Sequence, residues 1–407
     1  MSTSSYQVKR LHNQPLVSDG HNTNGPSVIK VPHWLGVNQR PFTIKNGKKI
    51  VAKYYLYYAN HNGKFIHMAW SHKIDSGYWF KFNRPDLGLN VVEVPGRGVL
   101  DLVNGPQRIY LNSSRSIYLG KPDGKPGHIA SPDVHVDHQK KRIIMYFHGN
   151  GSGTAFRRNS KGQRIPYPAK QNTYVATSVD GLNFNLPDLG GQAGHGILPI
   201  CIGRAYMRVF SYRGQTYGFS RSALINISPH DPLALPDPEF PTDSTWTAIG
   251  IQEQTELSQY FREYYLPEIN HYRSELNQPS FKQFDLEGQV FPRHLCVRRL
   301  PDERHLEVFF SVKFKKGGNF EQWRPPNDSE RILRVVYDLS CEPWQIQSDA
   351  NGQMRIEEIL KAETYWELKG LCDPFVFIDT DKRIYLFYSG GPIQSEGAIG
   401  MVELSPK

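Results

Sequence analysis

The chain has 407 residues and a formal net charge of +9. Its 22 Tyr, 21 Phe, 35 Gly and 29 Pro favour strands separated by turns over long helices. Lys and Arg are scattered, and neither an RNA-binding signature nor zinc-finger spacing occurs, which argues against a nucleic-acid partner. The positive charge leaves an acidic polysaccharide open as a partner.

Two further features concern covalent chemistry and location. The four cysteines, Cys201, Cys296, Cys341 and Cys372, are widely spaced and include no CxxC pair, so we expect buried thiols rather than a structural zinc site or a disulfide framework. The first residues lack the apolar stretch of a signal peptide, and no segment reaches membrane-spanning length. We therefore expect no membrane partner and a cytoplasmic protein as given, or a secreted or periplasmic one if a leader has been removed.

Five β-rich modules follow one another along the chain. The first begins at Gly25-Pro-Ser-Val, the second at Ser131-Pro-Asp-Val and the last at Asp373-Pro-Phe-Val. Two weaker copies lie between the second and the last. The first strands of the five modules are expected near residues 25, 132, 206, 292 and 373. In the second module, Asp180-Gly181 is typical of a hairpin turn.

These repeats predict an all-β fold, a five-bladed β-propeller with long inter-strand insertions, in which residues 1–407 form a single domain. The first four modules are longer than an ordinary blade, so we expect insertions at 77–127, 150–171, 225–285 and 340–370. The basic run Lys45–Lys53 is interpreted as a hairpin turn. Glu253–Tyr265 is the only stretch of helical length, and its apolar spacing fits a helix poorly.

Polar residues at the starts of the first strands are predicted to converge on the propeller axis, because the innermost strand of each blade lines the central channel. The candidate catalytic residues are Asp133, His135, His294 and Asp373, and the candidate substrate-binding residues are Asn24, His128, Tyr206, Arg208 and Arg293.

Asp133 and Asp373 are interpreted as occupying matching positions in two modules. Two carboxylates that face one channel are what acid–base cleavage of a glycosidic bond requires, with one protonated and the other ionised. The alternative is that each Asp caps a turn at its strand entry.

The arginines and histidines leave several roles open. Arg208 and Arg293 have the planar shape that binds a substrate carboxylate or sulfate, or they hold the aspartates in place. His135, His148 and His294 are candidates for an acid or base, for a metal cluster, or for buried core residues. Because no histidine pair has metal-ligand spacing, we assign no metal ligand and expect no cofactor, with a metal such as calcium as the alternative.

Three segments carry a resemblance to a known family: Asn24-Gly-Pro-Ser-Val-Ile, then His128 to Asp137 with the strand from Arg142, and Asp373-Pro-Phe-Val-Phe with the strand from Ile384. Together they resemble the five-bladed propellers related to glycoside hydrolase family 43. The resemblance implies an axial pocket with a general base, a general acid and a third, orienting carboxylate. It also implies an Asp before the proline of blade one as the base, where this chain has Asn24-Gly25-Pro26, and Asp133 in the position of the orienting carboxylate.

Three functions follow from this sequence. The first is hydrolysis of a glycosidic bond, with an anionic oligosaccharide as one candidate substrate, by Asp133 and Asp373 or by a histidine base. The second is elimination on a uronic acid, in which Arg neutralises the carboxylate and His or Tyr206 removes the C5 proton. The third is sugar binding without cleavage. In each case the partner is an oligosaccharide or polysaccharide.

Overall fold

The computed structural model describes a large part of the chain. The described residues are 5–18, 23–60, 65–82, 100–101, 129–149, 154–158, 164–168, 172–184, 201–204, 206–213, 215–220, 223–228, 266–275, 277, 279–280, 290–314, 330–341, 344–352, 354–367, 370–391 and 397–407. Among them, no helix is long and apolar enough to cross a membrane.

Five antiparallel sheets of three to five strands follow the chain. The first contains β3 (Thr23–Lys30), β6 (Tyr54–Asn60), β7 (Phe65–Ser71), β8 (Phe80–Lys81) and β9 (Leu100–Asp101). The second contains β10 (Ile129–Asp137), β11 (Arg142–Gly149), β14 (Asn172–Ser178) and β15 (Cys201–Arg204). The third contains β16 (Arg208–Tyr212), β17 (Gln215–Ser220) and β18 (Ala223–Ser228).

The fourth sheet contains β19 (Val290–Arg299), β20 (His305–Phe314), β21 (Ile332–Asp338), β22 (Gln345–Ile346) and β23 (Glu357–Leu360). The fifth contains β24 (Leu371–Ile378), β25 (Ile384–Gly390) and β26 (Ala398–Pro406), together with β1 (Tyr6–Arg10) and β2 (Val17–Ser18) from the start of the chain. Two separate hairpins are β4 (Phe42–Lys45) with β5 (Lys48–Val51), and β12 (Thr154–Arg158) with β13 (Arg164–Pro168). Within the described ranges, the helical elements are the 3₁₀ turn Val37–Gln39 and α2 (Leu266–Glu275).

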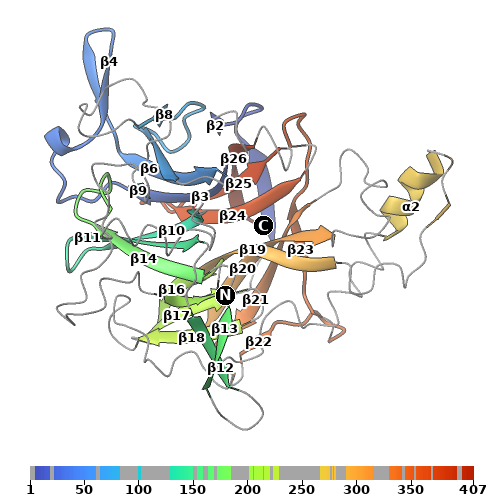
Figure 1. Cartoon of the computed structure of the whole chain (residues 1–407). Coiled ribbons are helices and arrows are strands. Elements are labelled where there is room, and N and C mark those ends of the chain that lie inside the picture. Colours follow the sequence, from blue (N-terminus) through green and yellow to red (C-terminus); the bar gives the residue numbers. More distant parts are fainter. Residues whose placement is uncertain are drawn as a thin grey trace.

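The sheets are arranged like the blades of a propeller (Figure 1). The first strand of each sheet contacts the first strands of its neighbours, since β3 lies against β10 and β24, and β19 lies against β24 and β16. The all-β, propeller-like prediction is therefore confirmed. The predicted count of five is not: four sheets have the four or five strands of a full blade, whereas β16–β18 form only three. The residues directly after β18 lie outside the described ranges.

Apolar side chains fill the space between neighbouring sheets. One cluster joins the first and second sheets, a second joins the third and fourth, and a third gathers the fifth sheet with parts of the first and fourth. The first, fourth and fifth sheets therefore pack apolar residues against a neighbour on either side, as the blades of a propeller do. Among the described residues, no hydrophobic cluster joins the second sheet to the third.

Two local predictions have different outcomes. The basic run Lys45–Lys53 does contain a hairpin turn, at Asn46-Gly47, whose φ values of 51° and 72° are those of a primed two-residue turn. Asp180-Gly181 is not the predicted hairpin turn. A hairpin turn here would need the partner strand of β14 to begin directly after Gly181, whereas that partner, β15, begins only at Cys201. The Asp180 carboxylate instead accepts hydrogen bonds from the backbone of Leu182 and Asn183, so this is an Asx-type turn.

The predicted insertions and helix fall mostly outside the described residues. The segment 77–127 is described only at residues 77–82 and 100–101, and most of 225–285 is not described. Within 150–171 the structure contains the β12–β13 hairpin, and within 340–370 it contains β22 and β23, which pair with β21. Glu253–Tyr265 lies outside the described residues, and helix α2 begins directly after it.

Candidate functional site

One residue in the left-handed region stands near the inner end of each first strand, either within the strand or just before it. These residues are Gly25, Ser131, Tyr206, His294 and Asp373, with φ between 49° and 65°. In β3, β10, β19 and β24 the residue lies in a β-bulge, where the register to the second strand shifts; Tyr206 lies two residues before β16. Left-handed backbone is unusual for residues other than glycine and tends to occur where function requires it. We name these five the inner-turn residues.

The strand registers correct the predicted match between Asp133 and Asp373. Ala130 pairs with His148 and Asp133 with Tyr146 on either side of one bulge, while Cys372 pairs with Ser389 and Phe375 with Phe387 on either side of the other. Ser131, not Asp133, is therefore the counterpart of Asp373. Asp133 lies two positions after the counterpart of Asp373. The prolines give the same match, because Ser131 and Asp373 each stand directly before a proline.

Neighbouring inner turns lie very close together. A Cβ atom added to Gly25 would stand 2.9 Å from the Cα of Ser131, and the backbone N–H of Gly25 donates a 3.0 Å hydrogen bond to Ser389 Oγ of the fifth sheet. Only a glycine fits here without a shift of the backbone, because the position combines left-handed φ with this close approach. An aspartate in place of Gly25 would clash with the backbone of Ser131.

The residue two positions after an inner turn ties its strand to the next sheet. Ser27 Oγ accepts a 2.9 Å hydrogen bond from the Val134 N–H, and Cys296 Sγ accepts one of 3.2 Å from the Val376 N–H. Asp133 holds the same place in the second sheet. Its Oδ2 accepts a 2.9 Å hydrogen bond from the N–H of Val209 in the third. Three sheets thus use one position for a bond to the next blade.

The environment of Asp133 keeps its carboxylate ionised. Burial, with 4% of the residue exposed, opposes ionisation. His135, whose Nε2 lies 3.0 Å from Oδ2, together with Arg208 and the Val209 N–H, outweighs burial, so the pKa of Asp133 lies below its usual value. Asp133 is accordingly an anion held by His135 of its own sheet and, from the third sheet, by the Val209 N–H and the nearby charge of Arg208.

Arg208 spans three sheets from its place at the start of β16. Its Nε donates to Leu295 O at 2.7 Å, and its Nη1 donates to Ser131 O and Pro132 O at 3.2 Å each. The residue is 2% exposed. Its Nη2 is buried and has no hydrogen-bond partner among the described residues. The guanidinium therefore donates its hydrogen bonds to backbone carbonyls of neighbouring inner strands.

Side chains from four strands or inner turns meet beside these contacts. The ring of Tyr206 lies between two imidazoles, with centroids 4.2 Å from His148 and 4.8 Å from His294. His294 Nδ1 is 2.9 Å from Asp373 Oδ1, and Cys372 Sγ is 3.4 Å from Asp373 Oδ2. We call these five residues the axial cluster. His148, His294 and Asp373 are buried, whereas Tyr206 and Cys372 are partly exposed.

The bulge explains why Cys372 and Asp373 both belong to the axial cluster. In a regular strand, successive side chains point to opposite faces. The left-handed φ of 49° at Asp373 breaks this alternation, so its carboxylate and the preceding thiol share one neighbourhood. Reading the strand with strict alternation places these two side chains on different faces.

The remaining predicted residues are placed as follows. Asn24 is buried in β3, one position before Gly25, and is thus the counterpart of Cys372. His135 is part-exposed beside Asp133. Arg293 lies in β19, but its side chain is not described, and His128 lies outside the described residues. Tyr206, His294 and Asp373 are the predicted residues that the structure brings together in the axial cluster.

The sequence prediction omitted Cys372 and made His148 only one of several histidines with an open role. Aligning the modules on the residue before each proline would have placed Ser131 beside Asp373, and Cys372 beside Ala130. His148 has no such signal, because its role comes from its pairing with Ala130, directly before the inner turn.

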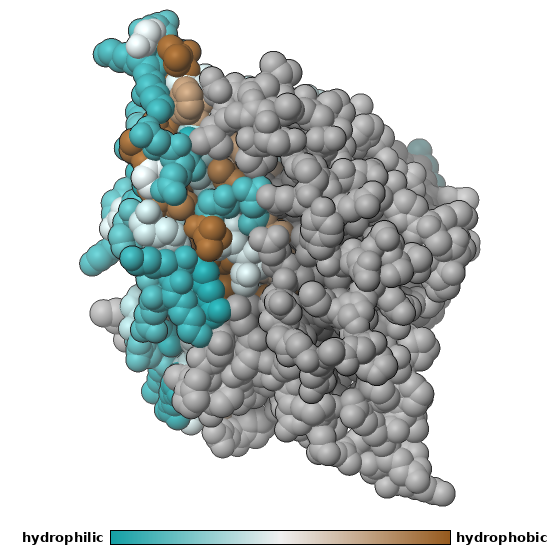
Figure 2. All heavy atoms as spheres, turned by 60° about the vertical axis from the view of Figure 1, so that its left-hand side comes forward, coloured by the Kyte–Doolittle hydropathy of each residue, from teal (hydrophilic) through white to brown (hydrophobic). Residues whose placement is uncertain are grey.

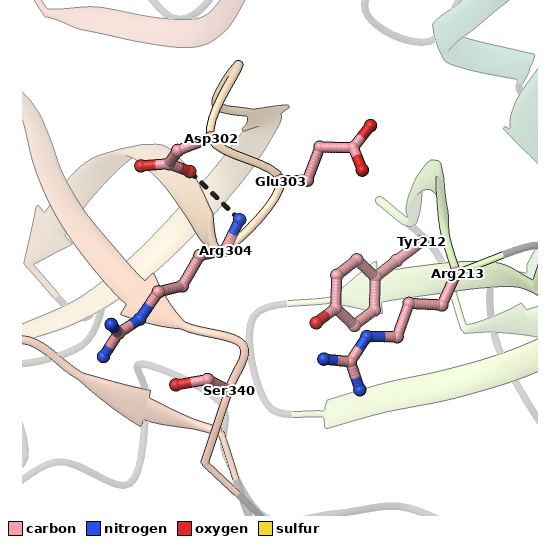
Figure 3. A pocket seen from close by; sticks show the side chains of 6 residues that line it. All are labelled: Tyr212, Arg213, Asp302, Glu303, Arg304 and Ser340. Carbon is pink, nitrogen blue, oxygen red and sulfur yellow. Dashed lines mark hydrogen bonds between the residues drawn. The ribbon is translucent and has the colours of Figure 1, made fainter. Parts of the chain in front are cut away.

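A separate cavity of about 340 Å³ lies at the other end of the same inner strands (Figure 3). Tyr212 and Arg213 from the end of β16 face the turn between β19 and β20, and the lining also includes Asp302, Glu303, Arg304 and Ser340. Asp302 and Arg304 are held within the protein, by His305 and Asp338. None of the predicted site residues lines this cavity.

Figure 2 shows the outer surface on the side of the first and second sheets. In Figure 2, hydrophilic residues cover most of the coloured part of this face, and hydrophobic residues form small groups between them. Scattered apolar residues of this kind are ordinary for a protein surface. The axial cluster is therefore the strongest candidate site of the described residues.

Comparison with known proteins assigns no family to this chain. No family model matches the sequence. One curated relative, the uncharacterized protein R118 of Acanthamoeba polyphaga mimivirus, is 28% identical over 204 residues, which is 48% of this chain and 41% of that protein. The matched region therefore spans less than half the length of the relative.

Several solved structures have a similar arrangement of strands. A thermostable family-43 glycoside hydrolase is 12% identical with a TM-score of 0.48, covering 96% of this chain and 93% of that one. Endo-1,5-alpha-L-arabinanase from Thermotoga petrophila RKU-1 is 11% identical with a TM-score of 0.49, covering 96% and 73%. An N-acetylgalactosamine deacetylase from F. plautii is 10% identical with a TM-score of 0.43, covering 99% and 95%.

Proposed function

We propose that this chain is a carbohydrate-active hydrolase that cleaves glycosidic bonds at the axial cluster, with histidines in place of a carboxylate pair. The observation that carries the proposal is the ordered contact of His148, Tyr206, His294 and Asp373 at the inner ends of four sheets. Five inner turns, one per sheet, support counting β16–β18 as the fifth blade of a single-domain propeller.

Hydrolysis needs one group that accepts a proton from water and another that donates a proton to the leaving oxygen. In the proposal, His294 accepts the proton of the attacking water, and Asp373 orients its imidazole through the 2.9 Å contact at Nδ1. His148, on the other side of Tyr206, donates the proton to the leaving oxygen. The Tyr206 ring holds the two imidazoles apart and fixes their orientation.

The other candidates take supporting roles. Asp133 is a positioning residue, because its carboxylate holds β16 through the Val209 N–H. Arg208 positions the inner strands through three carbonyls. Asp373 is the only one of the five inner-turn residues that has a carboxylate, since Gly25 and Ser131 stand at the matching places in the first and second sheets. A two-carboxylate mechanism would need a second carboxylate from elsewhere.

Elimination on a uronic acid is the second candidate, and the contact of Tyr206 with two imidazoles favours it. Polysaccharide elimination uses such residues to remove the C5 proton. One experiment separates these functions: the full chain is incubated with a panel of neutral and acidic oligosaccharides. Hydrolysis gives new reducing ends alone, elimination adds the ultraviolet absorbance of an unsaturated product, and binding without either would contradict both enzyme proposals.

A further inference from the structure

His294, Cys372 and Asp373 offer three metal-ligand atoms within 4.8 Å of one another. The imidazole Nδ1 lies 2.9 Å from one carboxylate oxygen, and the thiol sulfur lies 3.4 Å from the other. Ligand atoms around a tetrahedral ion with bonds of about 2.0–2.3 Å stand about 3.3–3.8 Å apart, so small side-chain movements would admit an ion between them.

We propose that these three residues bind a thiophilic divalent metal ion of the zinc class. A nitrogen, a sulfur and an oxygen ligand together match zinc, whereas calcium prefers six to eight oxygen ligands. The proposal concerns binding by the chain itself and does not depend on which glycoside, if any, is cleaved.

The backbone supports this arrangement. Cys372 and Asp373 are consecutive residues, and the left-handed φ of 49° at Asp373 brings both side chains to one place. His294 comes from the next inner strand and has a left-handed φ of 51° itself. Both bends are inner turns of the kind found in every sheet, and at this place they bring the three ligand atoms together.

Burial also favours an ion. The side chains of His294 and Asp373 are 6% and 3% exposed, so an ion here is shielded from water on most sides. A divalent ion binds a thiol and a carboxylate in their anionic forms, and here the two groups lie side by side. Tyr206 lies against His294 at 4.8 Å between ring centroids and restrains the imidazole.

Three protein ligands leave one tetrahedral position open, which is the arrangement of catalytic rather than structural zinc sites. This part of the inference rests on the proposed function: the ion, instead of the His294 imidazole, would activate the attacking water. The chain then supplies the proton donor, His148, and the restraint on the ligand, Tyr206.

The test measures metal binding without any sugar. The full chain is stripped with a chelator, exposed separately to Zn²⁺, Co²⁺ and Ca²⁺, desalted, and analysed for metal content and for absorption by a Co²⁺–thiolate bond. We expect one Zn²⁺ or Co²⁺ per chain and a Co²⁺–thiolate band. Cys372→Ser should lose the band and weaken binding at least about 10-fold.

Cys341→Ser is the matched control, because Cys341 is also a free, partly exposed cysteine and does not belong to the axial cluster. It should keep both the metal and the band. Retention of only Ca²⁺, no retained metal, or a band that persists in Cys372→Ser would each overturn the proposal. A chain that binds zinc but yields no new reducing ends would disprove the proposed function and leave the metal site intact.

Discussion

The carboxylate of Asp133 accepts a 2.9 Å hydrogen bond from the backbone N–H of Val209, and this bond joins the second sheet to the third. Ser27 and Cys296 make the same bond from the same position in the first and fourth sheets. No hydrophobic cluster of described residues joins the second and third sheets. The hydrogen bond to Asp133 therefore contributes more to holding these two sheets together than the matching bonds do elsewhere.

Replacing Asp133 by Asn should therefore affect stability first. The variant loses the charge that faces His135 and Arg208, and we expect the free energy of unfolding to fall by about 1–3 kcal/mol at neutral pH. Denaturant midpoints measure this. An unchanged midpoint together with abolished activity would instead favour a direct catalytic role for Asp133.

The same carboxylate predicts a dependence on pH. Its pKa is lower in the folded chain than in the unfolded chain, where it is about 3.9. The stabilisation is therefore fully present above that unfolded value and is lost as the pH falls through the folded value. The difference in unfolding free energy between the wild type and Asp133→Asn should shrink below about pH 4. A constant difference from neutral pH down to pH 3 would contradict this.

Gly25 offers a test of how tightly the inner turns approach. Gly25→Ala places a Cβ 2.9 Å from Ser131 Cα, while the control Gly47→Ala, with a similar positive φ, meets nothing within 4 Å. Both variants carry the cost of left-handed backbone, and only Gly25→Ala adds the clash. We expect it to be less stable than the control by about 1–3 kcal/mol. Equal stabilities would show that the inner turns have room for a side chain.

The described cysteines should differ in reactivity. Burial raises the pKa of Cys296 to about 12, so its thiolate is scarce at pH 8, whereas Cys341 is partly exposed. In the native chain, iodoacetamide should modify Cys341 and leave Cys296 intact, and both should react in denaturant. Peptide mapping by mass spectrometry measures this. Equal native labelling would contradict the buried bond between Cys296 and Val376.

Tyr206→Phe separates the two proposed reactions. The variant keeps the ring between His148 and His294 and loses only the hydroxyl. If the reaction is hydrolysis by the histidines, the rate should stay within a few-fold of the wild type. If elimination uses the phenol as its base, the rate should fall by about 100-fold or more. Tyr206→Ala, which removes the ring, should impair either reaction.

Much of the fold follows from repetition in the sequence, because residues before a proline recur at the starts of three modules. Gly25, Ser131 and Asp373 mark the inner turns in this way. The site was harder to predict. Asp133 looks like a channel residue in the sequence, yet its carboxylate is bound to the next sheet. The bulge shifts the register locally, and hydrophobic patterning carries no record of that shift.

Cys372 and His148 are the opposite case, because they belong to the axial cluster although the sequence did not indicate it. The first shares a site with Asp373 only because the left-handed turn breaks the alternation of the strand. The second reaches Tyr206 from the second strand of another sheet. Contacts of this kind depend on how neighbouring blades pack against each other, and local sequence patterns do not encode this packing.

The central claim is that the axial cluster cleaves glycosidic bonds, and His294→Gln tests it most directly. The wild type, His294→Gln and the control His271→Gln, whose side chain is 78% exposed on α2, are compared with oligosaccharides by the release of reducing ends. Thermal unfolding of each variant checks that it is folded. We predict release by the wild type and the control, and at least about a 100-fold lower rate in folded His294→Gln. Equal rates in all three, or no release by any, would contradict the account.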